Sequence, residues 1–317
     1  MPLVAGIDEA GYGPTLGPLV VGASVWRVPD ADVNIWRALR ACVCKADASS
    51  SWKLAVDDSK KVYGASRKLE SLERPVLAFA SAAGVRVGCL SQLLADLGSA
   101  RLSEPHTPWY DALETELPVE REKSAFESVA ARLSREMDKS GVSLRGMMAR
   151  VVGEARFNDR VRQTRNKGAV LIEQVLDLIT RIVRRAGSEP VSIHVDRLGG
   201  RANYREMLAQ ALPAFELAEL EISDGVSAYQ LTNGDQKCRV DFATESEQRH
   251  LPVALASMVA KYLREVLMRH FNAWWRGHLP DARPTAGYYN DAQRFLADIA
   301  PVITKAGVDP AHFVRER

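Results

Sequence analysis

The stretch that decides the fold runs from Leu3 to Trp26 and reads LVAGIDEAGYGPTLGPLVVGASVW. A short apolar run ends on two adjacent carboxylates, Asp8 and Glu9, and a second apolar run begins at Leu19. The residues between the runs are rich in glycine and proline, so the pattern predicts two strands joined by a tight, backbone-exposing bend. Acids at the end of a buried strand are costly unless a positive charge meets them, and a divalent metal is the usual partner. The alternative is a turn that carries two solvated acids.

The length and composition are those of a globular protein. The chain has 317 residues, 46% of them hydrophobic and 26% charged, which suits one large α/β domain or two unequal domains. A formal net charge of +2 neither requires nor excludes a nucleic-acid partner, so a basic surface has to be local, with 156–167 and 181–185 as candidates. The four cysteines lack metal-site spacing and are expected to be reduced. Because no membrane span or signal peptide is recognisable, we expect a cytoplasmic protein.

Beyond the opening hairpin, predicted strands and helices alternate. Apolar periodicity predicts strands at 142–152, 190–196, 215–223, 228–232 and 240–243, and one near 85–89. It predicts helices at 120–139, 166–186, 203–212, 251–270 and 291–300. Asn233-Gly234-Asp235 is a hairpin signal. This order predicts an α/β domain with a mixed sheet.

The predicted helix from Leu251 is unusually rich in small residues. Ala254, Ala256, Ser257 and Ala260 allow close packing against a neighbour. Trp274, Trp275 and Pro280 are expected to end the helix.

A second polar cluster follows a short apolar run at 54–56. It reads Asp57-Asp58-Ser59-Lys60-Lys61. Backbone N–H groups at a helix start, together with an ammonium group, suit a phosphate. The alternative is a plain helix cap at Ser59 with solvated lysines.

Acids also mark two later segments. Asp196 ends another apolar strand, and Glu247 lies where a helix begins. Carboxylates gathered with Asp8 and Glu9 at one sheet edge would not all ionise without cations between them. Two Mg²⁺ or Mn²⁺ ions about 4 Å apart, held by such acids, are a common means of phosphodiester hydrolysis.

Other chemistries find little support in the sequence. It contains no Gly-x-Ser-x-Gly elbow, Walker loop or His-Glu-x-x-His, and no clear Rossmann helix follows Gly11-Tyr12-Gly13. His194, two residues before Asp196, is expected to be packed or hydrogen-bonded rather than a metal ligand.

Four segments together carry a resemblance to a known family. They are Asp8-Glu9-Ala10-Gly11-Tyr12-Gly13-Pro14 with Gly17-Pro18, Asp58-Ser59-Lys60-Lys61, Val195-Asp196, and Ala256-Ser257-Met258-Val259-Ala260-Lys261. In this order the chain resembles ribonuclease HII, the type 2 ribonuclease H, over about residues 3–62 and 166–300. The resemblance implies a ribonuclease H-like fold, with a central mixed β-sheet flanked by helices and a C-terminal helical portion. It further implies one catalytic domain over 1–317, with an insertion at about 85–160 and a helical extension from about 262.

The resemblance also implies an activity. It is that of a divalent-metal-dependent endonuclease that hydrolyses the RNA strand of RNA–DNA hybrids and cuts on the 5′ side of an embedded ribonucleotide, with two Mg²⁺ or Mn²⁺ ions. No protein partner is predicted. Asp8, Glu9 and Asp196 match the family's catalytic, metal-binding acids. Counting back ten residues from the serine of the Ala-Ser motif gives Glu247 as the fourth acid, with Glu245 as the other candidate.

The resemblance assigns substrate-binding roles to further residues. They are Gly11, Tyr12 and Gly13 beside the ribose 2′-hydroxyl, Ser59 and Lys60 near the phosphates, and Tyr288 near the ribose. Tyr12 stands where the family has arginine, which removes a charge-assisted contact and favours longer ribonucleotide runs, as in the related type III enzymes. Two alternatives stay open. One is a catalytically silent hybrid-binding protein, and the other is a nuclease of the same fold that acts on another nucleic-acid structure.

Overall fold

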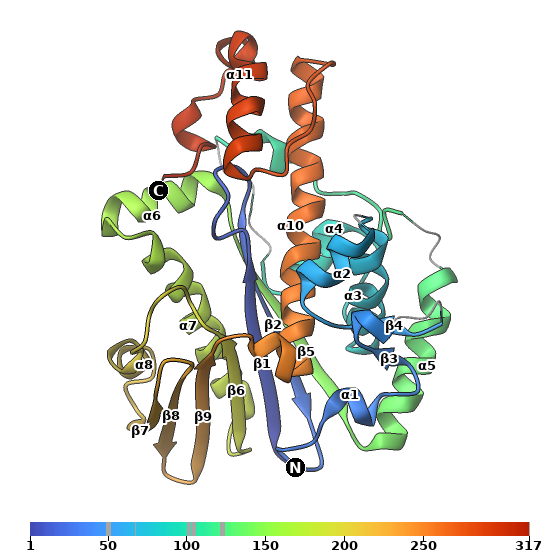
Figure 1. Cartoon of the computed structure of the whole chain (residues 1–317), viewed down its shortest axis with the longest axis vertical. Helices are drawn as coiled ribbons and strands as arrows, with labels where there is room; N and C mark the ends of the chain where they lie inside the picture. The colour runs from blue at the N-terminus through green and yellow to red at the C-terminus, as the bar shows by residue number, and fades with distance from the viewer. Residues whose placement is uncertain (49–51, 67, 100–101, 103–105, 121–123, 317) are drawn as a thin grey trace.

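The structure is a computed structural model that describes residues 1–48, 52–66, 68–99, 102, 106–120 and 124–316. Within these residues, seven strands form one sheet (Figure 1). Side by side, they are β5 (Ser143–Val152), β2 (Leu19–Arg27), β1 (Leu3–Ala10), β6 (Val191–Asp196), β9 (Gln236–Ala243), β8 (Val226–Asn233) and β7 (Glu216–Ile222). β1 runs parallel to β6 and β6 parallel to β9, whereas the other neighbours are antiparallel. The mixed α/β sheet predicted from the sequence is confirmed.

β1 lies near the middle of the sheet and is buried on both faces. Leu3, Ala5 and Ile7 belong to the hydrophobic cluster on one face, and Val4 belongs to the cluster on the other. This alternation follows from the two-residue period of a strand. By the same period, Asp8 lies on the face of Val4, close to the end of the strand.

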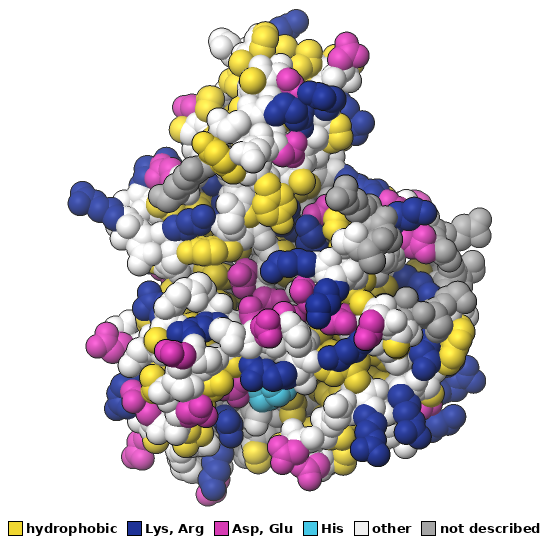
Figure 2. Space-filling model, viewed as in Figure 1, with side chains coloured by type: hydrophobic (Ala, Val, Ile, Leu, Met, Phe, Trp, Pro, Cys, Tyr) yellow, Lys and Arg dark blue, Asp and Glu magenta, His cyan; other side chains and the backbone are white. Residues whose placement is uncertain are grey.

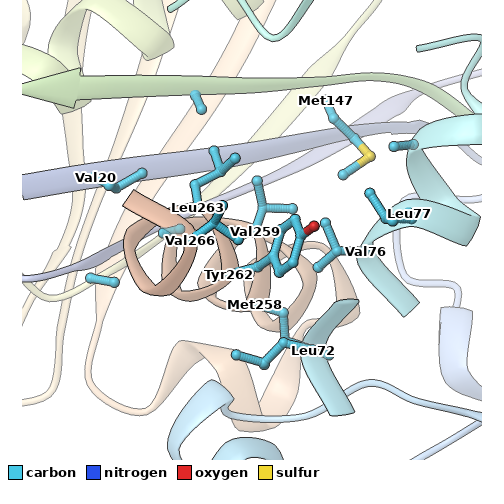
Figure 3. Packing of buried hydrophobic residues seen from close by; sticks show 14 of the residues in the cluster. Val20, Leu72, Val76, Leu77, Met147, Met258, Val259, Tyr262, Leu263 and Val266 are labelled. Carbon is cyan, nitrogen blue, oxygen red and sulfur yellow. The ribbon is translucent and has the colours of Figure 1, made fainter. Parts of the chain in front are cut away.

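Helices cover both faces of this sheet. α10 (Leu251–His278) crosses β1 and β2 on one face, where α3 (Glu70–Ala82) and α5 (Ser124–Ser140) also pack (Figure 1). α7 (Lys167–Ala186) covers the opposite face. Figure 3 shows the core on the α10 side, where residues of α10 and α3 meet β2 and β5: Met258, Val259, Tyr262, Leu263, Val266, Leu72, Val76, Leu77, Val20 and Met147.

The remaining elements are shorter or lie outside the sheet. The helices are α1 (Ile35–Ala38), α2 (Ser59–Ser66), α4 (Leu90–Asp96), α6 (Glu154–Thr164), α8 (Arg205–Ala211), α9 (Ser246–Arg249) and α11 (Tyr289–Ala306). Single 3-10 turns are η1 (Ala46–Ala48), η2 (Pro108–Tyr110) and η3 (Pro310–His312), and β3 (Val43–Cys44) pairs with β4 (Leu54–Ala55). The helical C-terminal portion is confirmed. In the described part of the chain, no helix combines the length and apolar character needed to cross a membrane.

Residues 85–160, which the resemblance treats as an insertion, take part in the main fold. They supply α4, α5 and the edge strand β5. Residues 100–101, 103–105 and 121–123 of this stretch lie outside the described residues.

The small residues of α10 face the sheet at very short range. A Cβ atom added to Gly6 of β1 would lie 2.1 Å from the backbone nitrogen of Val253, and one added to Gly22 of β2 would lie 2.4 Å from the carbonyl oxygen of Ala256. Glycines in the strands and small residues on the helix therefore allow backbone to approach backbone. This close contact brings Ser257 of α10 to the end of β1.

Two local predictions are wrong. Residues 85–89 are not a strand, because they follow the turn at Gly84 and form only an isolated bridge between Cys89 and Glu116. α10 continues past Trp274 and Trp275 to His278, because Trp275 is buried among aromatic rings. Tertiary packing thus overrides local helix-ending signals. The hairpin turn predicted at 233–235 is confirmed by the pairing of Asn233 with Gln236.

Candidate active site

The predicted acids meet at one edge of the sheet. Asp8 and Glu9 lie near the carboxyl end of β1, and Asp196 is the last residue of β6, the parallel neighbour of β1. β9 runs parallel to β6 and leads into α9, which carries Glu247. Parallel strands end at the same edge, so acids from three segments converge there. Figure 2 shows acidic side chains gathered near the middle of this face, with Lys and Arg side chains beside them.

The four carboxyl groups interact electrostatically with one another. Burial, with the charges of Glu9 and Asp196 added, raises the pKa of Asp8 well above its usual range. Burial and the charge of Asp196 raise the pKa of Glu9 to about 7. Burial raises the pKa of Asp196 as well. For Glu247, burial, Asp196 and Asp58 raise the pKa to about 7. Such a group binds protons or cations far more readily than separate surface acids do.

Short contacts hold the acids in place. The backbone N–H of Glu9 donates to Asp8 Oδ1 at 2.7 Å, and that of Ser246 donates to Asp196 Oδ1 at 3.2 Å. The hydroxyl of Ser257 on α10 is hydrogen-bonded to Asp8 and lowers its pKa in part. Both the sheet and α10 therefore position the cluster.

Ser59 and Lys60 begin α2 beside these acids. Ser59 is buried, and its Oγ lies within hydrogen-bonding distance of Ser257 Oγ, at 3.0 Å. Lys60 is exposed, and its positive charge offsets part of the rise in the pKa values of Glu9 and Asp196. Ser59 thus joins α2 to α10, and Lys60 places a cation at the rim of the site.

Two residues that the sequence did not single out as site residues also lie here. Asp58 precedes Ser59 and raises the pKa of Glu247. Lys45 donates from Nζ to the carbonyl oxygen of Gln248 at 2.7 Å. Asp58 belongs to the same short motif as Lys60, so its proximity was a usable signal. Lys45 had no such signal, because its partner is 203 positions away.

The remaining predicted residues lie in the loop after β1 and at the start of α11. Gly11 has a φ of +89°, Gly13 is exposed, and the ring of Tyr12 lies 4.9 Å from Lys167 Nζ. Burial, followed by the charge of Glu9, raises the pKa of Tyr12. Tyr288 caps α11, and its ring is half exposed.

Glu245, the other candidate for the fourth acid, precedes α9. It is exposed and has a φ of +53°. The group that interacts electrostatically with Asp196 is Glu247.

The donor set suits a hard divalent ion. Asp8, Glu9, Asp196 and Glu247 offer only carboxylate oxygens, the ligands that Mg²⁺ and Mn²⁺ prefer. The Oε2 atom of Glu247 is buried and has no hydrogen-bond partner among the described residues. As they stand, the described His, Cys, Asp and Glu side chains form no group of three spaced to hold an ion. The all-oxygen donor set and the unpartnered Oε2 atom of Glu247 nevertheless fit such an ion.

His194 lies outside this arrangement. Its Nδ1 is 3.0 Å from both carboxylate oxygens of Asp241, and its ring stacks on His250 at a centroid distance of 3.7 Å. The prediction of a hydrogen-bonded histidine is confirmed.

Three arginines of the basic stretches proposed from the sequence are paired with acids. Arg160 pairs with Glu173, Arg162 pairs with Asp159 and Glu316, and Arg181 pairs with Asp177. Lys60 is a cation that interacts with the acids, through Glu9 and Asp196.

No family model matches the chain, and no curated protein matches its sequence. Solved structures do resemble it. Ribonuclease H2 from Pyrococcus horikoshii OT3 is 15% identical, with a TM-score of 0.46 over 98% of this chain and 92% of that chain. Ribonuclease HII from Archaeoglobus fulgidus, solved as a complex with PCNA, is 17% identical, with a TM-score of 0.42 over 99% and 94%. Bst-RNase HIII in complex with Mn²⁺ is 16% identical, with a TM-score of 0.43 over 99% and 66%.

Proposed function

We propose that this chain is a divalent-metal-dependent endonuclease that hydrolyses the RNA strand of RNA–DNA hybrids. The observation that carries the proposal is the convergence of Asp8, Glu9, Asp196 and Glu247 from three segments of the chain. They are the residues that match the acids of the ribonuclease HII motifs. Lys60, from a fourth matching segment, lies beside them.

The four acids would hold two Mg²⁺ or Mn²⁺ ions. When bound, such ions activate the attacking water and stabilise the leaving oxygen of the phosphodiester. The chain's own cations and backbone would bind and orient the nucleic acid. Lys60 at the rim is placed to contact a substrate phosphate, and the exposed ring of Tyr288 is available to a sugar.

A substrate panel tests this function directly. The substrates are an RNA–DNA hybrid, a duplex with one embedded ribonucleotide, a branched DNA and single-stranded RNA, each assayed with Mg²⁺, Mn²⁺ or a chelator. We expect metal-dependent cutting of the hybrid and weaker cutting at a single ribonucleotide, because Tyr12 replaces an arginine. Tight hybrid binding with no cutting in either metal would identify a silent binding protein. Cutting of the branched DNA alone would identify a different nuclease.

Lys60→Ala is expected to weaken hybrid binding about equally for all sequences. The logarithm of the affinity falls linearly with the logarithm of the salt concentration, and each phosphate contact that is lost makes this slope less steep by about 1. Binding measured between low and moderate salt gives this slope. Lys237→Ala, which removes an exposed lysine of the β8–β9 hairpin, is the matched control. An unchanged slope in the Lys60 variant would mean that Lys60 is only a surface charge.

Trp52 is a second candidate contact for the nucleic acid. Its side chain is 51% exposed although tryptophan is usually buried. Lys53 Nζ lies 4.8 Å and Arg132 Cζ lies 5.4 Å from the centre of its ring. An exposed aromatic ring between two cations suits a base or sugar with its phosphate.

Trp52→Ala is therefore expected to weaken hybrid binding about tenfold, the loss that follows removal of one stacking contact. The turnover rate at saturating substrate should stay the same, because the ring lies outside the acid cluster. Trp52→Phe should retain most of the affinity. Equal affinity of the alanine variant and the unmodified protein would exclude Trp52 from the interface.

A further inference from the structure

Two buried arginines lie beneath the loop formed by residues 11–17, here called the glycine loop. Arg315, which follows η3, is only 3% exposed. Its Nη1 donates to the carbonyl oxygen of Gly11 and, at 3.5 Å, to that of Gly17, while Nη2 donates to the carbonyl oxygen of Tyr12 at 3.2 Å. The backbone N–H of Arg315 donates to the carbonyl oxygen of Thr15 at 2.8 Å. One residue thus binds four carbonyl groups of the glycine loop.

Arg264 of α10 binds the same loop from another side. It is fully buried, and its Nη2 donates to the carbonyl oxygens of Leu16 at 3.2 Å and Ala286 at 2.9 Å. A Cβ atom added to Gly11 would lie 2.6 Å from Arg264 Nε, so the loop closes tightly over this side chain. Arg264 therefore ties the glycine loop to the turn that precedes Tyr288.

The segment that carries Arg315 is itself fastened to α6. Asn158 Nδ2 donates to the carbonyl oxygens of Ala311 and Val314, both at 2.8 Å, and Asn158 Oδ1 accepts from the backbone N–H of Glu316. The guanidinium of Arg315 also lies 3.8 Å from the centre of the Phe157 ring. Its position is thus determined by α6 and not by the glycine loop alone.

The direction of these hydrogen bonds fixes the direction of the loop's N–H groups. In a trans peptide, the C=O and N–H groups point in opposite directions. Because the carbonyl groups of Gly11 and Tyr12 point toward the guanidinium group of Arg315, the N–H groups of Tyr12 and Gly13 point away from it. Successive N–H groups turned to one side form an anion-binding surface. This surface adjoins the acids, since Tyr12 interacts electrostatically with Glu9.

The buried charges are only partly neutralised. Two acids lie near them. Glu265 Oε1 is 3.7 Å from Arg264 Nη1, and the fully buried Glu154, whose Oε1 accepts a hydrogen bond from Tyr110 at 3.1 Å, lies near Arg315. Arg264 Nε and Nη1 and Arg315 Nε have no hydrogen-bond partner among the described residues. Burying two guanidinium groups this way costs folding free energy. The positive charge they retain adds to the attraction of the loop for an anion.

We propose that Arg315, together with Arg264, is a positioning residue that holds the glycine loop so that its N–H groups face a phosphate of the nucleic acid. The inference rests on the proposed function. Because the chain has Tyr12 where the family has arginine, the positive charge near the loop comes from Arg315 and Arg264 instead. Arg315 acts through the loop backbone and does not touch the substrate.

The test compares Arg315→Met, Arg315→Lys and, as a control on the neighbouring helix α6, Arg162→Met. Arg162 pairs with Glu316 at the surface, so its loss leaves the glycine loop supported. Hydrogen exchange of the Tyr12 and Gly13 amides in the metal-free protein is expected to be at least about tenfold faster in Arg315→Met, while the amides of β1 and β2 keep their protection. With hybrid and Mg²⁺, the turnover rate is expected to fall about 30-fold with little change in KM. Arg315→Lys should recover part of both losses, and Arg162→Met should resemble the unmodified protein.

The two readouts separate this inference from the proposed function. If the unmodified protein cuts no hybrid, the proposed function is lost, but amide exchange still decides whether Arg315 holds the loop. If Arg315→Met does not fold, the same comparisons are made with Arg315→Lys. Unchanged exchange at Tyr12 and Gly13 overturns the inference, and so does a uniform loss of protection across β1 and β2, which would indicate a general structural role.

Discussion

Replacing Asp8 with asparagine is expected to lower the rate of hybrid cleavage by at least about 1,000-fold in Mg²⁺ and in Mn²⁺. Asp8 lies at the centre of the site, since it interacts with Glu9, Asp196 and Ser257. The substitution preserves shape and removes the negative charge that a divalent ion needs. Losses of this size follow the removal of a group that stabilises charge in the transition state. Cleavage under single-turnover conditions measures the effect.

The expected loss is in chemistry and not in folding or binding. The Asp8→Asn variant should therefore retain hybrid binding and a cooperative unfolding transition. Glu247→Gln and Glu245→Gln form a matched pair that assigns the fourth acid, because Glu247 interacts with Asp196 whereas Glu245 is exposed. We expect a large loss for Glu247→Gln and a small one for Glu245→Gln. Full activity of Asp8→Asn would remove the metal-dependent mechanism altogether.

Replacing Glu9 with glutamine is expected to stabilise the metal-free protein at pH 8 by roughly 3 kcal/mol. Burial and Asp196 raise the pKa of Glu9 from 4.5 to about 7. Between these two values the folded state binds more protons than the unfolded state, so stability falls as the pH rises. The loss of folding free energy caused by ionised Glu9 is complete above pH 7 and is absent below about pH 4.5. A shift of this size corresponds to roughly 3 kcal/mol.

Urea unfolding in the presence of a chelator at pH 4.5 and at pH 8 measures this difference. The variant should be more stable than the unmodified protein at pH 8 and equal to it at pH 4.5. Saturating Mn²⁺ should stabilise the unmodified protein more than the variant. The control is Glu216→Gln, since Glu216 is exposed on β7. Equal stability of Glu9→Gln and the unmodified protein at pH 8 would show that the acids do not repel one another.

Local pattern was sufficient for most of the fold. The apolar runs around the opening bend predict β1 and β2, and the stripe of 166–186 predicts α7, because strand and helix periods are local properties. The predictions of a strand at 85–89 and of a helix end at Trp274 were wrong, because local pattern does not determine the structure at these positions. There, side-chain and backbone partners distant in sequence determine the structure.

The candidate site divides in the same way. Asp8, Glu9 and Asp196 were predictable, because acids at the ends of apolar strands stand out in a sequence and parallel strands end together. Their electrostatic interaction in the structure agrees with that expectation. Lys45 and Arg315 were not predictable, because nothing near them in the sequence indicates the carbonyl groups they bind.

The sequence by itself determined the strand that carries the first acids and the mixed sheet, and it predicts metal-dependent chemistry for clustered carboxylates. Tertiary structure alone decided which cations surround that cluster and what holds the glycine loop. The physical reason is range: periodicity and turn chemistry act over a few residues, whereas Arg315 meets Gly11 across 304 positions. A contact of that kind depends on how whole elements pack, and only the folded chain brings its two partners together.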